Sequence, residues 1–183
     1  SYNNVGGILA EDHSVVGDSA ASVNQGSGIS AGDGCVVSRC TASGNGTGTL
    51  GVGVSAGNKV NISDCVVVSN RTVGVYAGAD CVITRNQVSH NGVGAAAAGI
   101  QVTGNNGRIE DNNIRNNSGD GILVDAAATG NLVAVGTDWA DASGNAGTAA
   151  RSSAYAVDTQ TSAGQNPPVV GGALAGQAAA DTA

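Results

Sequence analysis

A glycine recurs along this chain at intervals of 21 to 25 residues, and this spacing restricts the possible folds most strongly. The residue after each glycine is Ile or Val, and the residue two further on is Ala or Val. This alternation predicts a short strand with one buried face. Strand-forming units that repeat at such a fixed period are typical of a solenoid. The six glycines are Gly7, Gly28, Gly53, Gly74, Gly99 and Gly121.

Two further apolar positions recur in each unit, and each predicts another strand. We therefore expect an all-β solenoid of about six to seven coils, with 21–25 residues per coil. Since the chain has no Phe or Met, its core must consist of small and branched aliphatic side chains. The second apolar position is Val16, Val37, Ile62, Ile83 and Ile109, and the third is Ala21, Ala42, Val67, Val88 and Ile114.

Two polar positions also recur at the coil spacing. The first predicts an asparagine ladder, because an amide at a turn can donate to one neighbouring coil and accept from the other. The second alternates in sign, so we expect each acid to lie between the bases of adjacent coils and to help fix the register. The two series are Asn24, Asn45, Asn70, Asn91 and Asn117, and Asp18, Arg39, Asp64, Arg85 and Asp111.

Two stretches of the repeat are similar to a known family. GVYAGADCVITRNQVSHNGVG, from Gly74, and GIQVTGNNGRIEDNNIRNNSGDGI, from Gly99, resemble the right-handed parallel β-helix repeat family of the pectate-lyase-like superfamily. The resemblance covers roughly residues 5–145. It implies right-handed coils, and family members range from polysaccharide lyases and hydrolases to phage tail proteins and bacterial surface proteins. The resemblance therefore predicts the fold and leaves the function open.

The repeat loses its phase after Gly136, which suggests three parts of the chain. We expect coils over residues 1–145, a cap or final partial coil over 146–169, and an Ala/Gly-rich tail over 170–183. Trp139 is expected to cover the last coil, and Tyr155–Val157 to add a final short strand.

Charge and hydropathy exclude two classes of partner. The net charge is -7 with only seven Lys and Arg, which disfavours nucleic acid because duplex binding needs clustered cations. No apolar stretch reaches the length of about 18 residues that a membrane helix needs. We therefore expect no nucleic-acid partner and no membrane insertion.

The cysteines and histidines do not suggest a reactive centre. Cys40 and Cys65 occupy one repeat position in adjacent coils, while Cys35 and Cys81 occupy another position two coils apart. We expect four free thiols in the core, because stacked parallel Cβ vectors do not converge as a disulfide requires. The two histidines fall at different repeat positions several coils apart, so they cannot share a ligand.

Three carboxylates form the strongest chemical candidate. Asp12 and Asp33 share a repeat position in adjacent coils, and Asp80 lies one position away two coils later. Carboxylates of this kind could bind Ca²⁺ or act on a glycoside. Asn58 interrupts the series, and the same residues suit solvated turns. Ca²⁺ at these residues is the one cofactor we consider, and no residue is predicted to be catalytic.

The function is predicted from these features together. We expect a non-catalytic structural, adhesion or assembly module of an extracellular, cell-surface or virion-fibre protein. The edge of the first coil has no helical cap in the sequence, so we expect end-to-end association as a homo-oligomer or filament. Carbohydrate is a possible ligand, although few aromatic residues are present to stack on sugar rings. The alternative is a fragment of a polysaccharide lyase or glycoside hydrolase with an incomplete or inter-subunit site.

Overall fold

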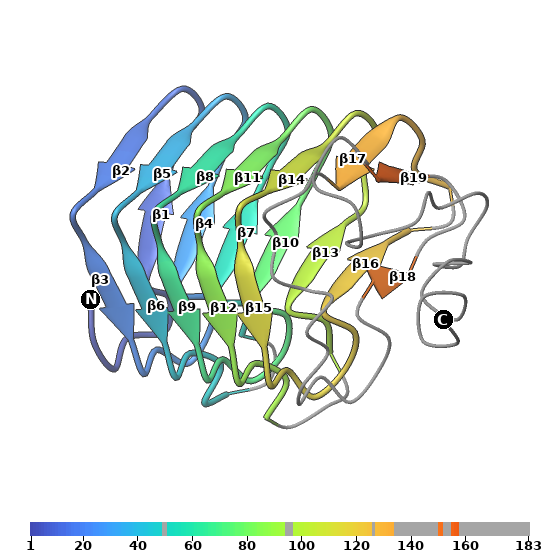
Figure 1. The fold of residues 1–183 in the computed structure, drawn as a ribbon. Coiled ribbons are helices and arrows are strands. Elements are labelled where there is room, and N and C mark those ends of the chain that lie inside the picture. The colour runs from blue at the N-terminus through green and yellow to red at the C-terminus, as the bar shows by residue number, and fades with distance from the viewer. Residues whose placement is uncertain (49–50, 94–96, 126, 134–149, 152–154, 158–183) are drawn as a thin grey trace.

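The computed structural model describes residues 1–48, 51–93, 97–125, 127–133, 150–151 and 155–157. Short strands run around each coil, and successive coils stack along one axis from the N-terminus (Figure 1). Every strand pairs in parallel with the equivalent strand of an adjacent coil. Among the described residues, no helix is long and apolar enough to cross a membrane. The predicted all-β parallel solenoid is confirmed.

The strands form three sheets, one for each side of the coil. The first sheet contains β1 (Ile8–Ala10), β4 (Ile29–Ala31), β7 (Val54–Ala56), β10 (Val75–Ala77), β13 (Ile100–Val102), β16 (Ile122–Val124) and β18 (Ala150–Arg151). The second contains β2 (Val15–Gly17), β5 (Val36–Ser38), β8 (Asn61–Ser63), β11 (Val82–Thr84), β14 (Arg108–Glu110), β17 (Asn131–Val133) and β19 (Tyr155–Val157). The third contains β3 (Ala20–Ser22), β6 (Thr41–Ser43), β9 (Val66–Val68), β12 (Gln87–Ser89) and β15 (Asn113–Arg115).

The apolar repeat positions lie in register and fill the interior. In β1, β4, β7, β10, β13 and β16 of the first sheet the two end residues face inward, as in the pair Ile29 and Val54. In β2, β5, β8, β11 and β14 of the second sheet, and in the third sheet, the middle residue faces inward, so that Ile62 stacks on Ile83. These side chains are fully buried. In β17 the two end residues, Asn131 and Val133, are the buried ones. Since the strands are only three residues long, the register depends on every coil presenting the same apolar positions.

The predicted number of coils was too high. The described residues make five complete three-stranded coils, from β1–β3 to β13–β15. The strands β16 and β17 continue the first two sheets, and β18 and β19 pair with them in turn. The strand predicted at 155–157 is therefore present as β19. Trp139 and the tail at 170–183 lie outside the described residues, and the division into three parts stays a prediction.

Three sharp corners connect the strands of each coil. At every corner one residue adopts the left-handed conformation, with φ between 49° and 67° at the positions given below. The residue after most of these left-handed positions is buried, as at Cys35, Cys40 and Asn45. The left-handed residues are His13, Gly34, Lys59, Asp80 and Asn106 at the first corner, Asp18, Arg39, Asp64, Arg85 and Asp111 at the second, and Val23, Gly44, Ser69, His90 and Asn116 at the third.

Candidate functional site

The asparagine ladder is confirmed inside the third corner. The side-chain amide of Asn45 donates to Asn70 Oδ1 at 2.9 Å and to the carbonyl of Ala21 at 2.9 Å. Asn70 Oδ1 also accepts the backbone N–H of Asn45 at 3.1 Å. Asn70 repeats these contacts with Asn91 in the next coil. Because each amide bonds to both neighbouring coils and is buried, the ladder joins the coils within an apolar interior.

Further asparagines lie inside the other two corners, and these were not predicted from the sequence. At the second corner, Asn86 Nδ2 donates to Asn112 Oδ1 at 3.0 Å, and Asn86 Oδ1 accepts the N–H of Cys65 at 2.9 Å. At the first corner, Asn131 Oδ1 accepts the N–H of Gly107. Their position in the repeat could have revealed them, because Asn86 and Asn112 directly follow two members of the charged series, Arg85 and Asp111. Cysteines hold the same position in earlier coils and concealed the pattern.

The four cysteines are free and buried, as predicted. Cys65 Sγ accepts the N–H of Cys40 at 3.4 Å, which is the contact that an asparagine Oδ1 makes elsewhere in this position. Burial raises the pKa of the Cys65 thiol to about 11, and burial also raises the pKa of Cys81. Since the thiolate is the nucleophilic form, these two thiols are poor nucleophiles at neutral pH.

The charged series lies outside the second corner, but it forms separate pairs. Arg39 donates to both carboxylate oxygens of Asp18, at 2.7 and 2.8 Å. Arg85 binds Asp64 in the same way, at 2.8 and 3.0 Å. Asp64 lies in the stack between Arg39 and Arg85, as predicted, but its carboxylate pairs with Arg85. Each guanidinium fork is filled by one carboxylate of the preceding coil, so the next carboxylate contributes only at longer range.

These hydrogen bonds affect the acids of both pairs. The hydrogen bond from Arg39 lowers the pKa of Asp18, and that from Arg85 lowers the pKa of Asp64. The side chains of Arg39 and Asp18 are nevertheless 60% and 68% exposed. Solvent therefore screens the attraction within each pair.

The candidate calcium residues lie outside the first corner. Asp12 Oδ1 accepts the N–H of Asp33 at 2.8 Å, and Asp33 Oδ1 accepts the N–H of Asn58 at 2.8 Å. Asn58 also donates its side chain to Asp33, and hydrogen bonds from Asn58 lower the pKa of Asp33. Asn58 thus continues the series that it was expected to interrupt, since its Oδ1 accepts the N–H of Ala79.

Asp80 does not join Asp12 and Asp33 in one cluster. It occupies the left-handed position beside their column and bonds Asn106 in the next coil. Within the described part of the chain, no group of three or more His, Cys, Asp and Glu side chains could hold a metal ion. Each of the two aligned carboxylates already accepts a backbone N–H. The calcium site stays a prediction, and the structure gives these residues a role in joining coils.

The two histidines lie at different corners. His13 occupies the left-handed position of the first corner in the first coil, and His90 occupies that of the third corner in the fourth coil. His13 lies against Gly34 of the next coil, where a β-carbon on the glycine would come within 3.0 Å of the imidazole. Their positions agree with the expectation that the two side chains share no ligand.

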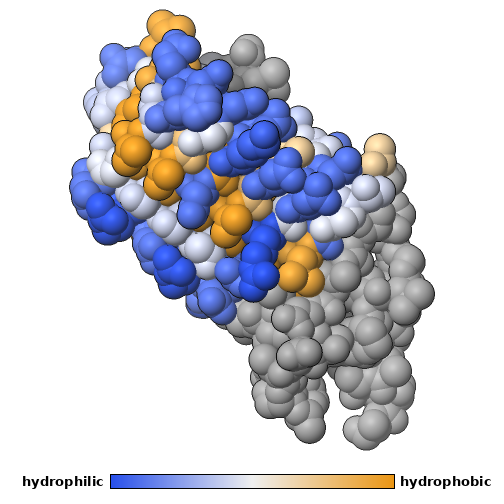
Figure 2. Space-filling model, turned by 90° about the horizontal axis from the view of Figure 1, so that it is seen from above, coloured by the Kyte–Doolittle hydropathy of each residue, from blue (hydrophilic) through white to orange (hydrophobic). Residues whose placement is uncertain are grey.

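An apolar stripe runs along the outer face of the second sheet. Val15, Val36 and Val82 point outward in β2, β5 and β11, and the first two are 75% and 37% exposed. Figure 2 looks down on this side of the molecule and shows apolar side chains in a line between rows of polar and charged ones. Asn61 and Arg108 interrupt the stripe. Its apolar surface is therefore concentrated near the N-terminal end.

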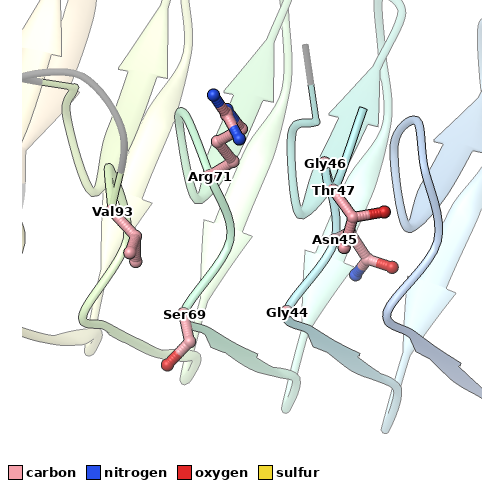
Figure 3. Close-up of a pocket in the computed structure, with 7 residues that line it drawn as sticks. All are labelled: Gly44, Asn45, Gly46, Thr47, Ser69, Arg71 and Val93. Carbon is pink, nitrogen blue, oxygen red and sulfur yellow. The ribbon is translucent and has the colours of Figure 1, made fainter. Parts of the chain in front are cut away.

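A shallow hollow of about 390 Å³ opens at the third corner, where three coils meet (Figure 3). Thr47 comes from the second coil, Ser69 and Arg71 from the third, and Val93 from the fourth. None of these residues was predicted from the sequence to form a site. The hollow combines one cation, two hydroxyl groups and an exposed aliphatic side chain.

One comparison with known proteins identifies the family. Residues 1–138 match the family model described as the right-handed β-helix region. No curated protein and no solved structure matches the chain significantly. The family match covers most of the chain and agrees with the stacked parallel coils. The chain therefore belongs to the right-handed β-helix family.

Proposed function

We propose that this chain is a non-catalytic structural module, a stiff segment that spaces or joins other parts of an extracellular, cell-surface or virion-fibre protein. The observation that carries the proposal is that polar side chains at the corners hydrogen-bond one coil to the next. At each corner they bond to the adjacent coil, where the buried amides of Asn45 and Asn70, the carboxylate of Asp33 and the Asp64–Arg85 pair serve as examples.

The geometry also supports a mechanical role. Parallel coils about 4.8 Å apart, each bonded to the next on three sides, form a rod that resists bending. The described thiols are buried, and the two histidines are far apart in the stack. A module that spaces its neighbours needs this stiffness and needs no reactive group.

Assembly end to end is the second part of the proposal. The strands β1 and β2 end the first and second sheets, whereas the edge of β3 is partly covered because Ser22 donates its N–H to the Ser1 carbonyl at 2.8 Å. Leu9 and Val15 at this end are 77% and 75% exposed. They line a hollow of about 500 Å³. Uncovered strand edges beside apolar side chains favour pairing with another chain, and we propose a second copy.

Electron microscopy with sedimentation across a concentration series tests this function. We expect fixed oligomers or filaments, and we expect Val15→Lys to dissolve them because it places a charge at the proposed junction. Val66→Lys is the control, because Val66 is also an outward-facing valine but lies on the third sheet of the third coil. A chain that stays monomeric at all concentrations would contradict the assembly proposal.

A second arm of the experiment addresses catalysis. Polysaccharides are incubated with the chain, with and without Ca²⁺, and with the variant Asp33→Ala. The structural proposal predicts no turnover and no stabilisation by Ca²⁺. Turnover that requires Ca²⁺ and disappears in Asp33→Ala would instead support the polysaccharide lyase or hydrolase hypothesis.

A further inference from the structure

The hollow at the third corner differs from its surroundings because its cation lies between two glycines. Arg71 follows the ladder residue Asn70, and the equivalent positions in the coils on either side are Gly46 and Gly92. The backbone confirms the alignment: Arg71 N–H donates to the Asn45 carbonyl, and Gly92 N–H donates to the Asn70 carbonyl, both at 2.9 Å. No side chain therefore flanks Arg71 in its own column.

The first of these glycines cannot be replaced without strain. Gly46 has φ of +90°, and a β-carbon there would come within 2.8 Å of the Arg71 β-carbon and 2.6 Å of the Gly51 Cα. The open space beside the arginine is thus a consequence of how the backbone turns at this corner. Figure 3 shows the Arg71 side chain, with Ser69 on the same turn and Thr47 on the adjoining turn.

The charge of Arg71 is available to a ligand. Arg39 and Arg85 are occupied by Asp18 and Asp64, whereas the Arg71 guanidinium has no hydrogen-bond or ion-pair partner among the described residues. Arg71 is exposed, and so are Thr47 and Ser69. A guanidinium presents a planar set of N–H donors that fits the two oxygens of one carboxylate.

The surroundings restrict the ligand further. Val93, which is 71% exposed, supplies an apolar wall of the hollow. With a net charge of -7 on the chain and one cation in the hollow, a single negative charge is favoured over a polyanion. We infer that this hollow binds one carboxylate carried on a short aliphatic group, with Arg71 pairing the carboxylate and Val93 contacting the aliphatic part.

This chemistry has two sources, which are a free aliphatic acid and a carboxylate of a second copy of the chain. The probe is butyrate, added to the full chain while the Arg71 side-chain N–H signals and the neighbouring amides are followed by NMR. Butyramide, which has the same shape without the charge, is the ligand control. We expect saturable shifts at Arg71, Thr47 and Val93 with butyrate and much weaker ones with butyramide.

Variants test the assigned residues. Arg71→Gln should weaken butyrate binding by about tenfold or more, because it removes a charge-assisted contact. Lys59→Gln is the matched control, since Lys59 is an exposed cation at the first corner, and it should bind butyrate as the wild type does. Val93→Asp should also prevent binding, because it places a competing carboxylate beside Arg71.

The outcomes separate the sources and decide the inference. If butyrate binds and Arg71→Gln leaves sedimentation unchanged, the ligand is a free acid. Self-association that Arg71→Gln abolishes, while Val15→Lys leaves it intact, would identify a second copy as the source. Equal binding of butyrate and butyramide, unchanged binding in Arg71→Gln, or no binding together with unchanged sedimentation would overturn the inference. Unfolding midpoints confirm that each variant is folded.

Discussion

The inside of the third corner and the outside of the second corner both carry polar side chains stacked coil upon coil, but in opposite environments. The amides of Asn24, Asn45 and Asn70 are buried, with 0 to 1% of their surface exposed. In the pair outside, the Arg39 and Asp18 side chains are 60% and 68% exposed. The inner series is continuous from coil to coil, whereas the outer one consists of separate pairs.

The difference shows that repetition alone does not reveal how much a ladder stabilises the fold. A buried amide that loses its partner leaves other buried groups unsatisfied, which costs about 1–3 kcal/mol for each such group. An exposed ion pair is replaced by water and salt when it is lost. We therefore expect the inner ladder to dominate stability and the outer pairs to contribute mainly to register.

The largest effect is expected for Asn70→Ala. This change removes the Oδ1 atom that accepts two hydrogen bonds from Asn45. It also removes the Nδ2 atom that donates to Asn91 Oδ1 and to the Ala42 carbonyl. We expect the free energy of unfolding to fall by about 3–5 kcal/mol, measured by urea denaturation. Gln87→Ala, on the exposed face of β12, is the control and should change it by no more than about 0.5 kcal/mol. Equal effects of the two changes would remove the distinction between inner and outer positions.

A smaller effect, of opposite sign, is expected where a cysteine interrupts an inner ladder. Cys65→Asn would extend the second-corner ladder, because its amide can donate to Asn86 Oδ1 and accept from the Cys40 N–H. We expect stabilisation by about 1 kcal/mol in the same urea assay. Cys81→Asn is the matched control, because the equivalent residue in the next coil is Gly107, which has no side-chain amide to accept a hydrogen bond. If both variants lose stability, space in the corner outweighs the added hydrogen bonds.

Alkaline pH probes the same buried position. The pKa of Cys65 is raised from 9.0 to about 11 in the folded chain, so the unfolded chain loses this proton first as the pH rises. The folded state holds more protons between these two values, and its stability should fall across that window. Cys65→Ala should show a smaller fall between about pH 8 and about pH 10 in urea denaturation. An unchanged pH dependence in this variant would show that the thiol is not protected by burial.

The smallest effect is expected outside the second corner. The hydrogen bond from Arg85 lowers the pKa of Asp64, so this pair stabilises the fold above the ordinary carboxylate pKa and loses that contribution as the pH falls through the folded value. Asp64→Asn should therefore cost far less than Asn70→Ala at neutral pH, and nothing in strong acid. Added salt should shrink the difference further. A salt-independent loss as large as that of Asn70→Ala would contradict the assignment of the pair to a screened surface.

The strand positions were predictable because burial imposes the same residue types on every coil. Ile62 and Ile83 share a position with the same demand for a branched apolar side chain, and the five ladder asparagines share another. The inner ladders of the first two corners were missed because a thiol or a valine can fill the same space, as at Cys40 and Val60. Sequence types alone could not show that side chains so different in polarity occupy equivalent positions.

The candidate sites were less predictable from the sequence, because they depend on how the backbone turns at each corner. Asp12 and Asp33 were correctly aligned, but their acceptance of backbone N–H groups depends on the turn of the first corner. The hollow around Arg71 required knowing that Gly46 and Gly92 are its neighbours in the stack, although they are 25 and 21 residues away. That alignment could be read from the sequence, because each of these residues directly follows a ladder asparagine. The hollow itself could not, because it depends on the path of the turns that follow, which differ in length.

Native-state hydrogen exchange followed by NMR tests the central claim most directly, because it compares inner and outer contacts in one molecule. The N–H of Asn45 and Asn70 donate to buried ladder oxygens at 3.1 Å, while the N–H of Asn58 donates to the exposed Asp33 carboxylate at 2.8 Å. We predict that Asn45 and Asn70 exchange only through global unfolding and that Asn58 exchanges through local opening. Exchange of the ladder amides at the rate of Asn58 would contradict the claim that buried amides hold the coils together.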